Sequence, residues 1–423
     1  MRRGPVTAED LAAAGVAVTP AASLAPFRAA WDAGAGALDR GDARLAFLAR
    51  SPAVSEAAQR YRAAFERYGQ VAALDDLVRQ YDAFARGLDT GAGTPIVKPD
   101  LAKRFPLGGV ASIQGELVAV DVTAARVTLE RDVLAALADF EAAFQEVYYW
   151  QRAAGILARV HDLAERVLDA ARARYRAGSA SHANLIQAEI REEALRVRLA
   201  TAYARRGAAR AALAAALALP SDALDSTSLH LDGLPPRPEK AAAAAAALAH
   251  GPAVAAARVA AARATLLVQL AEREMLPNLG AGSAVPGLGE RMPAKDLMVA
   301  TGGPFLREMQ VRAEAAADAL ADAERRAPAR AEGAWVTLDD ARRRYASAAG
   351  HQLARAEQGV EVAEQGYRAG TATFFDLDSA VQLYLGAALD ARAALRDAWV
   401  AAALLDAVVG TGPADAAQPQ ETP

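Results

Sequence analysis

Two seven-residue segments decide the fold: Tyr-Arg-Ala-Gly-Ser-Ala-Ser at residues 175–181, and Tyr-Arg-Ala-Gly-Thr-Ala-Thr at residues 367–373, 192 positions later. A second pair, Ala-Arg-Ser-Pro-Ala-Val at 49–54 and Ala-His-Gly-Pro-Ala-Val at 249–254, is separated by 200 positions. Two pairs of segments occur in the same order at nearly the same separation. They predict a duplicated unit of about 200 residues, which is too long for a solenoid repeat.

Each copy of the first segment has the pattern of a helix end followed by a new helix. Gly178 and Gly370 come after a helical stretch, and we expect both in the left-handed conformation that closes many helices. Ser181 and Thr373 are each followed three positions later by a polar residue, which predicts a capping box at the start of the next helix. The order helix, tight turn, helix is therefore predicted twice.

The stretches before these turns are predicted to be very long helices. Apolar residues there repeat every 3.5 positions, the spacing of coiled coils, although an ordinary amphipathic helix in a soluble bundle explains any one stretch equally well. Residues 109–178 and 304–370 contain few helix breakers, so each predicts a rod of roughly 100 Å at 1.5 Å per residue. Pro328 and Gly333 interrupt the second rod and predict a kink.

Glycine and proline also gather at 75–109 and 277–304. Small and apolar residues alternate over 279–285, and residues 297–301 are expected to pair back on them, which predicts a β-hairpin. The earlier cluster contains the strand-like segment 76–86 and predicts a second hairpin.

These signals give the domain organisation of the chain. The N-terminal extension covers residues 1–43, and the linker between the two repeats covers 220–239. The first repeat, 44–219, contains a helix, a β-hairpin at about 76–109, a long helix, a tip turn at about 176–182 and a helix. The second repeat, 240–410, contains the same order, with its hairpin at about 277–304 and its tip turn at about 368–374. A mobile tail covers 411–423.

Composition excludes several classes of protein. The chain has 423 residues, 53% of them hydrophobic, a net charge of −4 and no cysteine. We therefore expect no nucleic-acid partner, disulfide or thiolate metal site. The longest uninterrupted apolar run, 241–249, is half of the roughly 18 residues that a spanning helix needs, so no transmembrane α-helix is expected.

No enzyme is expected either, because the chain has no phosphate-binding loop, dinucleotide fingerprint or nucleophile elbow. We assign no cofactor. The histidines show no ligand spacing with one another or with a carboxylate motif, so we expect no metal site. They are His161, His182, His230, His250 and His351.

The ordered motifs of both repeats resemble the TolC-like outer-membrane efflux channel family, the outer membrane factors. The resemblance covers about residues 45 to 410. Its segments are 104–109, 175–178, 184–188, 217–220, 275–279, 296–299, 304–305, 367–371, 376–380 and 404–410.

The resemblance implies a mainly α fold, a long antiparallel coiled-coil helical barrel. Two short β-hairpins per chain would contribute to a trimeric 12-stranded β-barrel in outer-membrane lipid. A homotrimer agrees with the residues, because a rod of roughly 100 Å cannot cover its own apolar stripe. Closing the barrel across three chains would remove its sheet edges.

The implied function is the outer-membrane channel of a tripartite efflux system, a passive exit duct that docks a periplasmic adaptor (membrane fusion) protein and an inner-membrane pump of RND or ABC type. The adaptor-docking tips implied by matching position are Arg176, Gly178, Ser179, Arg368, Gly370 and Thr371. The implied tunnel constriction consists of Asp376, Asp378 and Asn184.

Two roles remain open for Asp376, which also fits a capping box that serves its own helix. Ser379 stands where the family often has a second acid, so a double acidic ring is not assigned. Tyr175 and Tyr367 are expected to pack between helices rather than to gate.

The implied location is the cell outer membrane with a periplasmic extension, although residues 1–10 make a poor secretory signal. Arg79, Asp82 and Arg86 place charge in the first hairpin, which leaves open a degenerate or truncated paralogue. The same residues also allow a soluble Ala-rich coiled-coil scaffold or a type I secretion exit duct for proteins.

Overall fold

The computed structural model describes residues 37–64, 66, 108–178, 181–231, 233–274 and 294–410. Several predicted features lie outside these residues. They are the first hairpin before Gly108, the second hairpin up to 293, Ser179, the tail 411–423 and most of the N-terminal extension.

Within the described residues, the chain is built from long helices, as the sequence predicts. In chain order, the larger elements are α3 (Arg40–Arg50), α6 (Gly108–Arg176), α7 (His182–Ala216), α8 (Lys240–His250), α9 (Pro252–Glu274), α10 (Ala294–Ser347), η2 (Ala348–Gln352), α11 (Leu353–Ala369) and α12 (Phe374–Val409). Residues 52–64 are also helical. The predicted first rod is confirmed as α6, a single helix of 69 residues.

The second predicted rod is formed by α10, η2 and α11. The α-helix α10 continues through Pro328 and Gly333, so the helix does not end there, and the predicted kink stays a prediction. A change in helical hydrogen bonding occurs at η2, a five-residue π-helix that directly joins α10 to α11. A π-helix turn contains one residue more than an α-helix turn. The side chains that follow η2 therefore face a different direction from the one they would face in an unbroken α-helix of the same length.

The predicted return strand at 297–301 is wrong, because these residues lie inside α10. Leu297, Met298 and Ala300 are good helix formers, which outweigh the two β-branched residues of this segment. Pro293 stands directly before the helix, and proline favours the start of a helix.

A small parallel sheet joins two segments that the sequence assigned to an extension and a linker. Strand β1 (Ala37–Asp39) pairs with β2 (Ser228–His230). The linker is held further by Arg210, whose guanidinium donates to the backbone oxygens of Asp225 (2.6 Å) and Thr227 (3.0 Å). Trp399 donates from Nε1 to the Gly233 oxygen at 3.1 Å.

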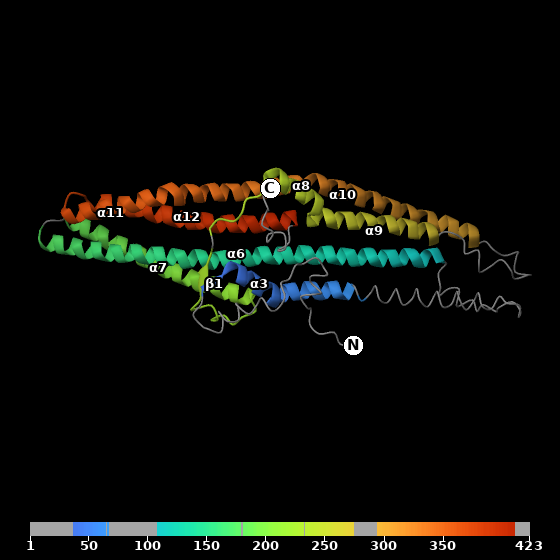
Figure 1. The fold of residues 1–423 in the computed structure, drawn as a ribbon, viewed down its shortest axis with the longest axis horizontal. Coiled ribbons are helices and arrows are strands. Elements are labelled where there is room, and N and C mark those ends of the chain that lie inside the picture. The colour runs from blue at the N-terminus through green and yellow to red at the C-terminus, as the bar shows by residue number, and fades with distance from the viewer. Residues whose placement is uncertain are drawn as a thin grey trace, which may run out of the picture. The chain divides into compact units, whose positions relative to one another are not determined.

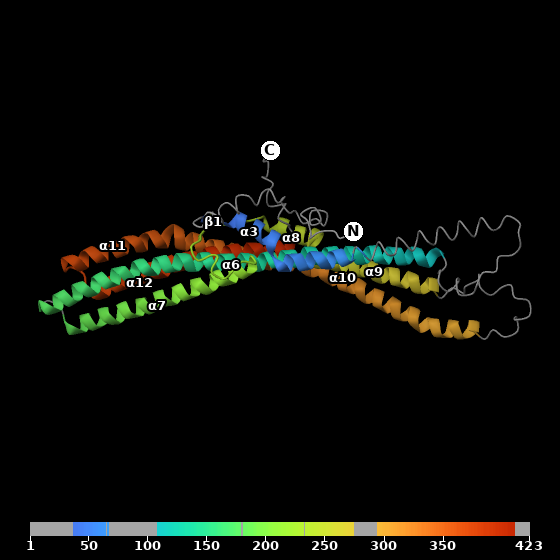
Figure 2. The ribbon, with the colours of Figure 1, turned by 90° about the horizontal axis from the view of Figure 1, so that it is seen from below.

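The chain divides into two compact units, and each repeat contributes to both. Unit 1 comprises 1–55, 133–244 and 330–423, and unit 2 comprises 56–132 and 245–329, as far as these ranges are described. The core of unit 1 is formed by α6, α7, α11 and α12, which run side by side (Figures 1 and 2). Small residues such as Ala154, Ala188 and Ala202 are fully buried there, which lets the helices approach closely.

A second part of the unit 1 core lies around α3. The rings of Phe47 and Phe140 stack at 4.8 Å. The Arg40 guanidinium lies 3.9 Å from the centre of the Trp399 ring and 2.9 Å from a carboxylate oxygen of Glu141. Glu141 is buried, and this ion pair compensates its charge.

Residues Lys240–Glu272, which span α8 and most of α9, are long and apolar enough to cross a membrane by length and composition alone. We expected no such segment because the longest uninterrupted apolar run is short. This alanine-rich stretch was not counted, because arginines interrupt it. Arg258 pairs with Glu324 at 3.2 Å, and Arg263 pairs with Asp121 at 2.7 Å. Both ion pairs lie within unit 2, as expected for a helix packed on other helices.

Candidate functional site

Both predicted turns lie at the same end of unit 1. The turn between α6 and α7 and the turn between α11 and α12 are close together in both views (Figures 1 and 2). We call these two turns and their flanking residues the helical tip, 174–184 and 366–378. Ser179 and Ala180 are outside the described residues.

The second turn is closed by a left-handed glycine, as predicted. Gly370 has φ 79°. The backbone oxygen of Gly366 accepts from the N–H of Thr371 (2.9 Å) and of Ala372 (3.1 Å), and from the Thr371 hydroxyl (3.2 Å). A Cβ on Gly366 would lie 3.0 Å from the Cβ of Ala372. Gly366 was not predicted as part of the turn, and its only signal in the sequence is a glycine four positions before Gly370.

The capping role predicted for Asp376 is confirmed. One Asp376 carboxylate oxygen accepts from the Thr373 N–H (2.8 Å) and from the Thr373 hydroxyl (2.7 Å). The Thr373 hydroxyl oxygen in turn accepts from the Asp376 N–H at 3.3 Å. The hydrogen bonds from the hydroxyl and the N–H of Thr373 lower the pKa of Asp376 below its ordinary value. The side chain is exposed and therefore charged at neutral pH.

The first turn also has a left-handed glycine, and the cap that follows it is simpler. Gly178 has φ 72°, and its N–H donates to the Tyr175 oxygen at 2.9 Å. The Ser181 hydroxyl oxygen accepts from the Asn184 N–H at 3.3 Å. Arg176 ends α6 and is exposed, as is Arg368 at the end of α11. The residues predicted to dock an adaptor, as far as the structure describes them, therefore face solvent in this chain.

Arg174 of the first turn contacts the second turn. Its guanidinium donates to the backbone oxygen of Tyr367 and, at 3.3 Å, to that of Arg368. It also lies 4.4 Å from the centre of the Tyr367 ring. A cation next to the last carbonyls of a helix is favourable because those carbonyls carry partial negative charge. Tyr367 is buried, as expected for a packing role, whereas Tyr175 is 43% exposed.

Asp378, the second residue of the predicted constriction, has a partner within the chain. One of its carboxylate oxygens lies 2.7 Å from Nε of Arg191 on α7, although the Nε–H bond does not point at that oxygen. Both residues line a cavity of about 30 Å³ between α6, α7 and α12, together with Leu163 and Phe374. Asp378 therefore joins α7 to α12, a contact that the sequence alone did not indicate.

Three solved structures have a fold similar to that of this chain. The outer membrane protein VceC of Vibrio cholerae has a TM-score of 0.64 and 14% identity over 88% of this chain and 96% of its own. The outer-membrane channel OprN gives 0.66 and 17%, over 88% and 90%. The MtrE outer membrane channel of Neisseria gonorrhoeae, in its open state, gives 0.60 and 16%, over 88% of both chains.

The chain has the TolC-like outer-membrane channel fold. No protein-family profile matches the sequence, and no curated protein matches it either. The similarity of fold is thus found from the backbone, at 14–17% sequence identity.

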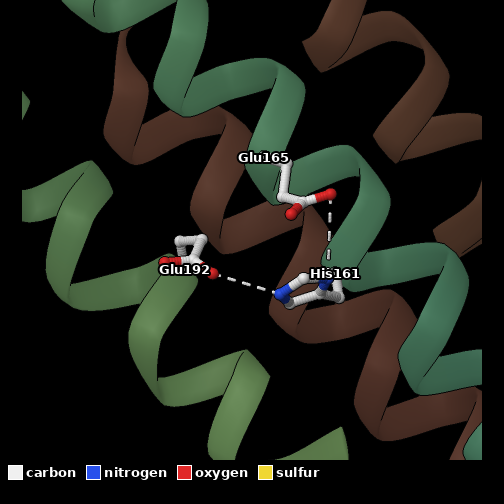
Figure 3. A group of neighbouring side chains, drawn as sticks. All are labelled: His161, Glu165 and Glu192. Carbon is white, nitrogen blue, oxygen red and sulfur yellow. Dashed lines mark hydrogen bonds and ion pairs between the residues drawn. The ribbon is translucent and has the colours of Figure 1, made fainter.

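The chain also contains a polar cluster away from the tip, between α6 and α7. His161 and Glu165 lie one turn apart on α6, and Glu192 reaches them from α7 (Figure 3). The prediction that no histidine has ligand spacing with a carboxylate is wrong for His161 and Glu165, which are four positions apart and so share one face of a helix. Glu192 could not be added from the sequence, because its proximity depends on how α7 packs.

Proposed function

We propose that this chain is the outer-membrane channel component of a tripartite efflux system. The observation that carries the proposal is the pairing of two left-handed glycine turns at one end of unit 1, in a chain with the fold of outer-membrane channels. A duct of this kind is passive. An inner-membrane pump supplies the energy, and a periplasmic adaptor docks on the helical tip.

Assembly into a homotrimer is supported by exposed apolar side chains on the long helices. Ile190 of α7, Val362 of α11 and Leu383 of α12 are 64%, 70% and 70% exposed in the single chain. Neighbouring copies of the chain would cover such residues. Strands from the hairpins predicted at about 76–109 and 277–304 would supply a barrel across three chains, without the helical residues 108–109 and 294–304.

The tip would serve both docking and constriction. The exposed arginines, Arg176 and Arg368, would contact the adaptor together with Gly178, Gly370, Ser179 and Thr371. Asp376 would form a ring of three carboxylates across the trimer, and such a ring attracts cations. Its hydrogen bonds with Thr373 fix the carboxylate at the start of α12 and keep it charged, so the capping and ring roles are compatible.

Membrane fractionation and gel mobility of unboiled samples test the proposal together. The expected result is sedimentation with outer membranes and a heat-sensitive band at the mass of a trimer. A compact monomer in buffer without detergent would refute the proposal and favour a soluble scaffold. If the trimer forms, comparing the export of small solutes and of proteins by cells with and without the chain distinguishes efflux from type I secretion.

A further inference from the structure

The cluster of His161, Glu165 and Glu192 brings one imidazole and two carboxylates together. Nε2 of His161 lies 3.1 Å from a carboxylate oxygen of Glu192, and Nδ1 lies 4.0 Å from an oxygen of Glu165. The side chains of His161 and Glu192 are 13% and 18% exposed, whereas that of Glu165 is 58% exposed. Figure 3 shows the three side chains converging from two helices.

The ring of His161 has one nitrogen available to bind a metal ion. A neutral imidazole carries one N–H, so its other nitrogen presents a lone pair. Only Nε2 lies within hydrogen-bond distance of a carboxylate, that of Glu192, whereas Nδ1 lies 4.0 Å from the exposed Glu165. The lone pair of the ring therefore lies close to carboxylate oxygens that bind the same kind of ion.

We propose that His161, Glu165 and Glu192 bind a divalent transition-metal ion, with Zn²⁺ as the best match. Zn²⁺ takes imidazole nitrogen and carboxylate oxygen at about 2.0–2.2 Å and accepts water in an open fourth position. Calcium and magnesium prefer all-oxygen sites, so the imidazole disfavours them. One ligand atom from each residue lies within 4.8 Å of the others. The exposed Glu165 side chain can rotate to close the set around an ion.

The site belongs to one copy of the duplicated unit. The positions that match His161, Glu165 and Glu192 in the second repeat are occupied by Leu353, Glu357 and Tyr384. The helix pair α11–α12 therefore lacks two of the three ligands. An ion bound at the first site would link α6 to α7 and would stabilise only that pair of helices.

One neighbouring charge should weaken the site. Nε of Arg196 lies 3.9 Å from the same Glu192 oxygen that faces His161. A positive charge at this distance competes with a cation for the carboxylate. Removing that charge should therefore strengthen metal binding, whereas removing a ligand should weaken it.

The test is a Zn²⁺ titration of the untagged full chain in detergent, after chelator treatment, in competition with a chromophoric chelator. We expect one ion per chain. His161→Gln and Glu192→Gln should each weaken binding at least about 10–100-fold, the loss that even the outer-shell partners of metal ligands can cause. Glu165→Gln, on an exposed side chain, should weaken it less. Arg196→Gln should tighten it about threefold.

Glu189→Gln is the matched control, since Glu189 is an exposed α7 carboxylate that pairs with Arg172 at 3.7 Å. Its affinity should equal that of the unchanged chain. Circular dichroism checks that every variant folds, and the spectrum of bound Co²⁺ reports nitrogen and oxygen ligands. Binding without one-to-one stoichiometry, or equal affinity in Glu165→Gln, Glu192→Gln and the unchanged chain, would overturn the proposal. This readout needs no pump, adaptor or membrane, so it is independent of the proposed function.

Discussion

The two turns of the helical tip share a left-handed glycine and a hydroxyl cap but differ in other side chains. Both close on a left-handed glycine, and a hydroxyl residue starts the following helix in each. Position for position, Gly366 in the second turn corresponds to Arg174 in the first, and Asp376 corresponds to Asn184. The second turn packs closely against Gly366, and Arg174 of the first turn contacts the second turn. The two turns of the predicted duplication are thus complementary partners rather than equivalent ends.

The largest effect is expected at Gly366. Gly366→Val would place a Cβ 3.0 Å from that of Ala372 and should destabilise the α11–α12 turn by about 2 kcal/mol. Hydrogen exchange of the turn amides measures this opening free energy. Gly359→Ala in the same helix is the control, because a Cβ there has open space. Equal effects from the two variants would show that close packing does not distinguish the turns.

Substitution of either left-handed glycine should destabilise its turn by a similar amount. Gly178→Val and Gly370→Val each force a β-branched residue into positive φ, at a cost of about 1–2 kcal/mol, while a Cβ at either position has open space. Hydrogen exchange at each turn provides the measurement. If the tip docks an adaptor, Gly370→Val should also abolish docking and leave trimers intact. Destabilisation of only one of the two turns would show that the left-handed glycine is not required equally in both.

Arg174 tests the contact between the turns. Arg174→Ala removes the donors to the Tyr367 and Arg368 oxygens and should destabilise the α11–α12 turn by about 1 kcal/mol, although the change lies on α6. Arg174→Lys should recover little, because lysine lacks the planar guanidinium. Arg176→Ala, two positions away on the same helix and exposed, should leave that turn unchanged. Loss of stability confined to the first turn would contradict the link.

The smallest effect concerns the charge of Asp376. Its pKa is lowered by the hydrogen bonds from Thr373, so the carboxylate stabilises the folded chain above the ordinary value of about 3.9. That contribution is lost as pH falls through the lowered pKa. Asp376→Asn should therefore be less stable than the unchanged chain at neutral pH, and the difference should vanish in acid. Unfolding curves across this range test it, and a difference independent of pH would assign no role to the charge.

Local sequence signals predicted the parts of the tip that depend on neighbouring residues. The glycine ends and the hydroxyl caps are set within a few positions of the chain, and the length of α6 follows from the small number of helix breakers. The Arg174 contact and the approach of Glu192 to His161 depend on helix packing, so no local pattern reports them. Strands β1 and β2 are three residues each and far apart in the chain. Such short segments carry no usable periodicity.

The return strand of the second hairpin fails as a prediction for a different reason. The strand at 297–301 is inferred from its position after a glycine-rich segment, and this inference gives too little weight to the helix propensity of the residues themselves. Propensity decides where no tertiary contact opposes it.

The π-helix η2 has a consequence for how insertions and deletions are tolerated in this chain. Each residue in an α-helix rotates the next by about 100°. Deleting Gly350 within η2 would replace a five-residue turn by an ordinary helical turn with one residue fewer, so Tyr367 would still face Arg174. The same deletion within α11 would turn Tyr367 away by about 100°, so η2 is the place in this helix where one residue can be lost without changing the side of α11 that meets α6.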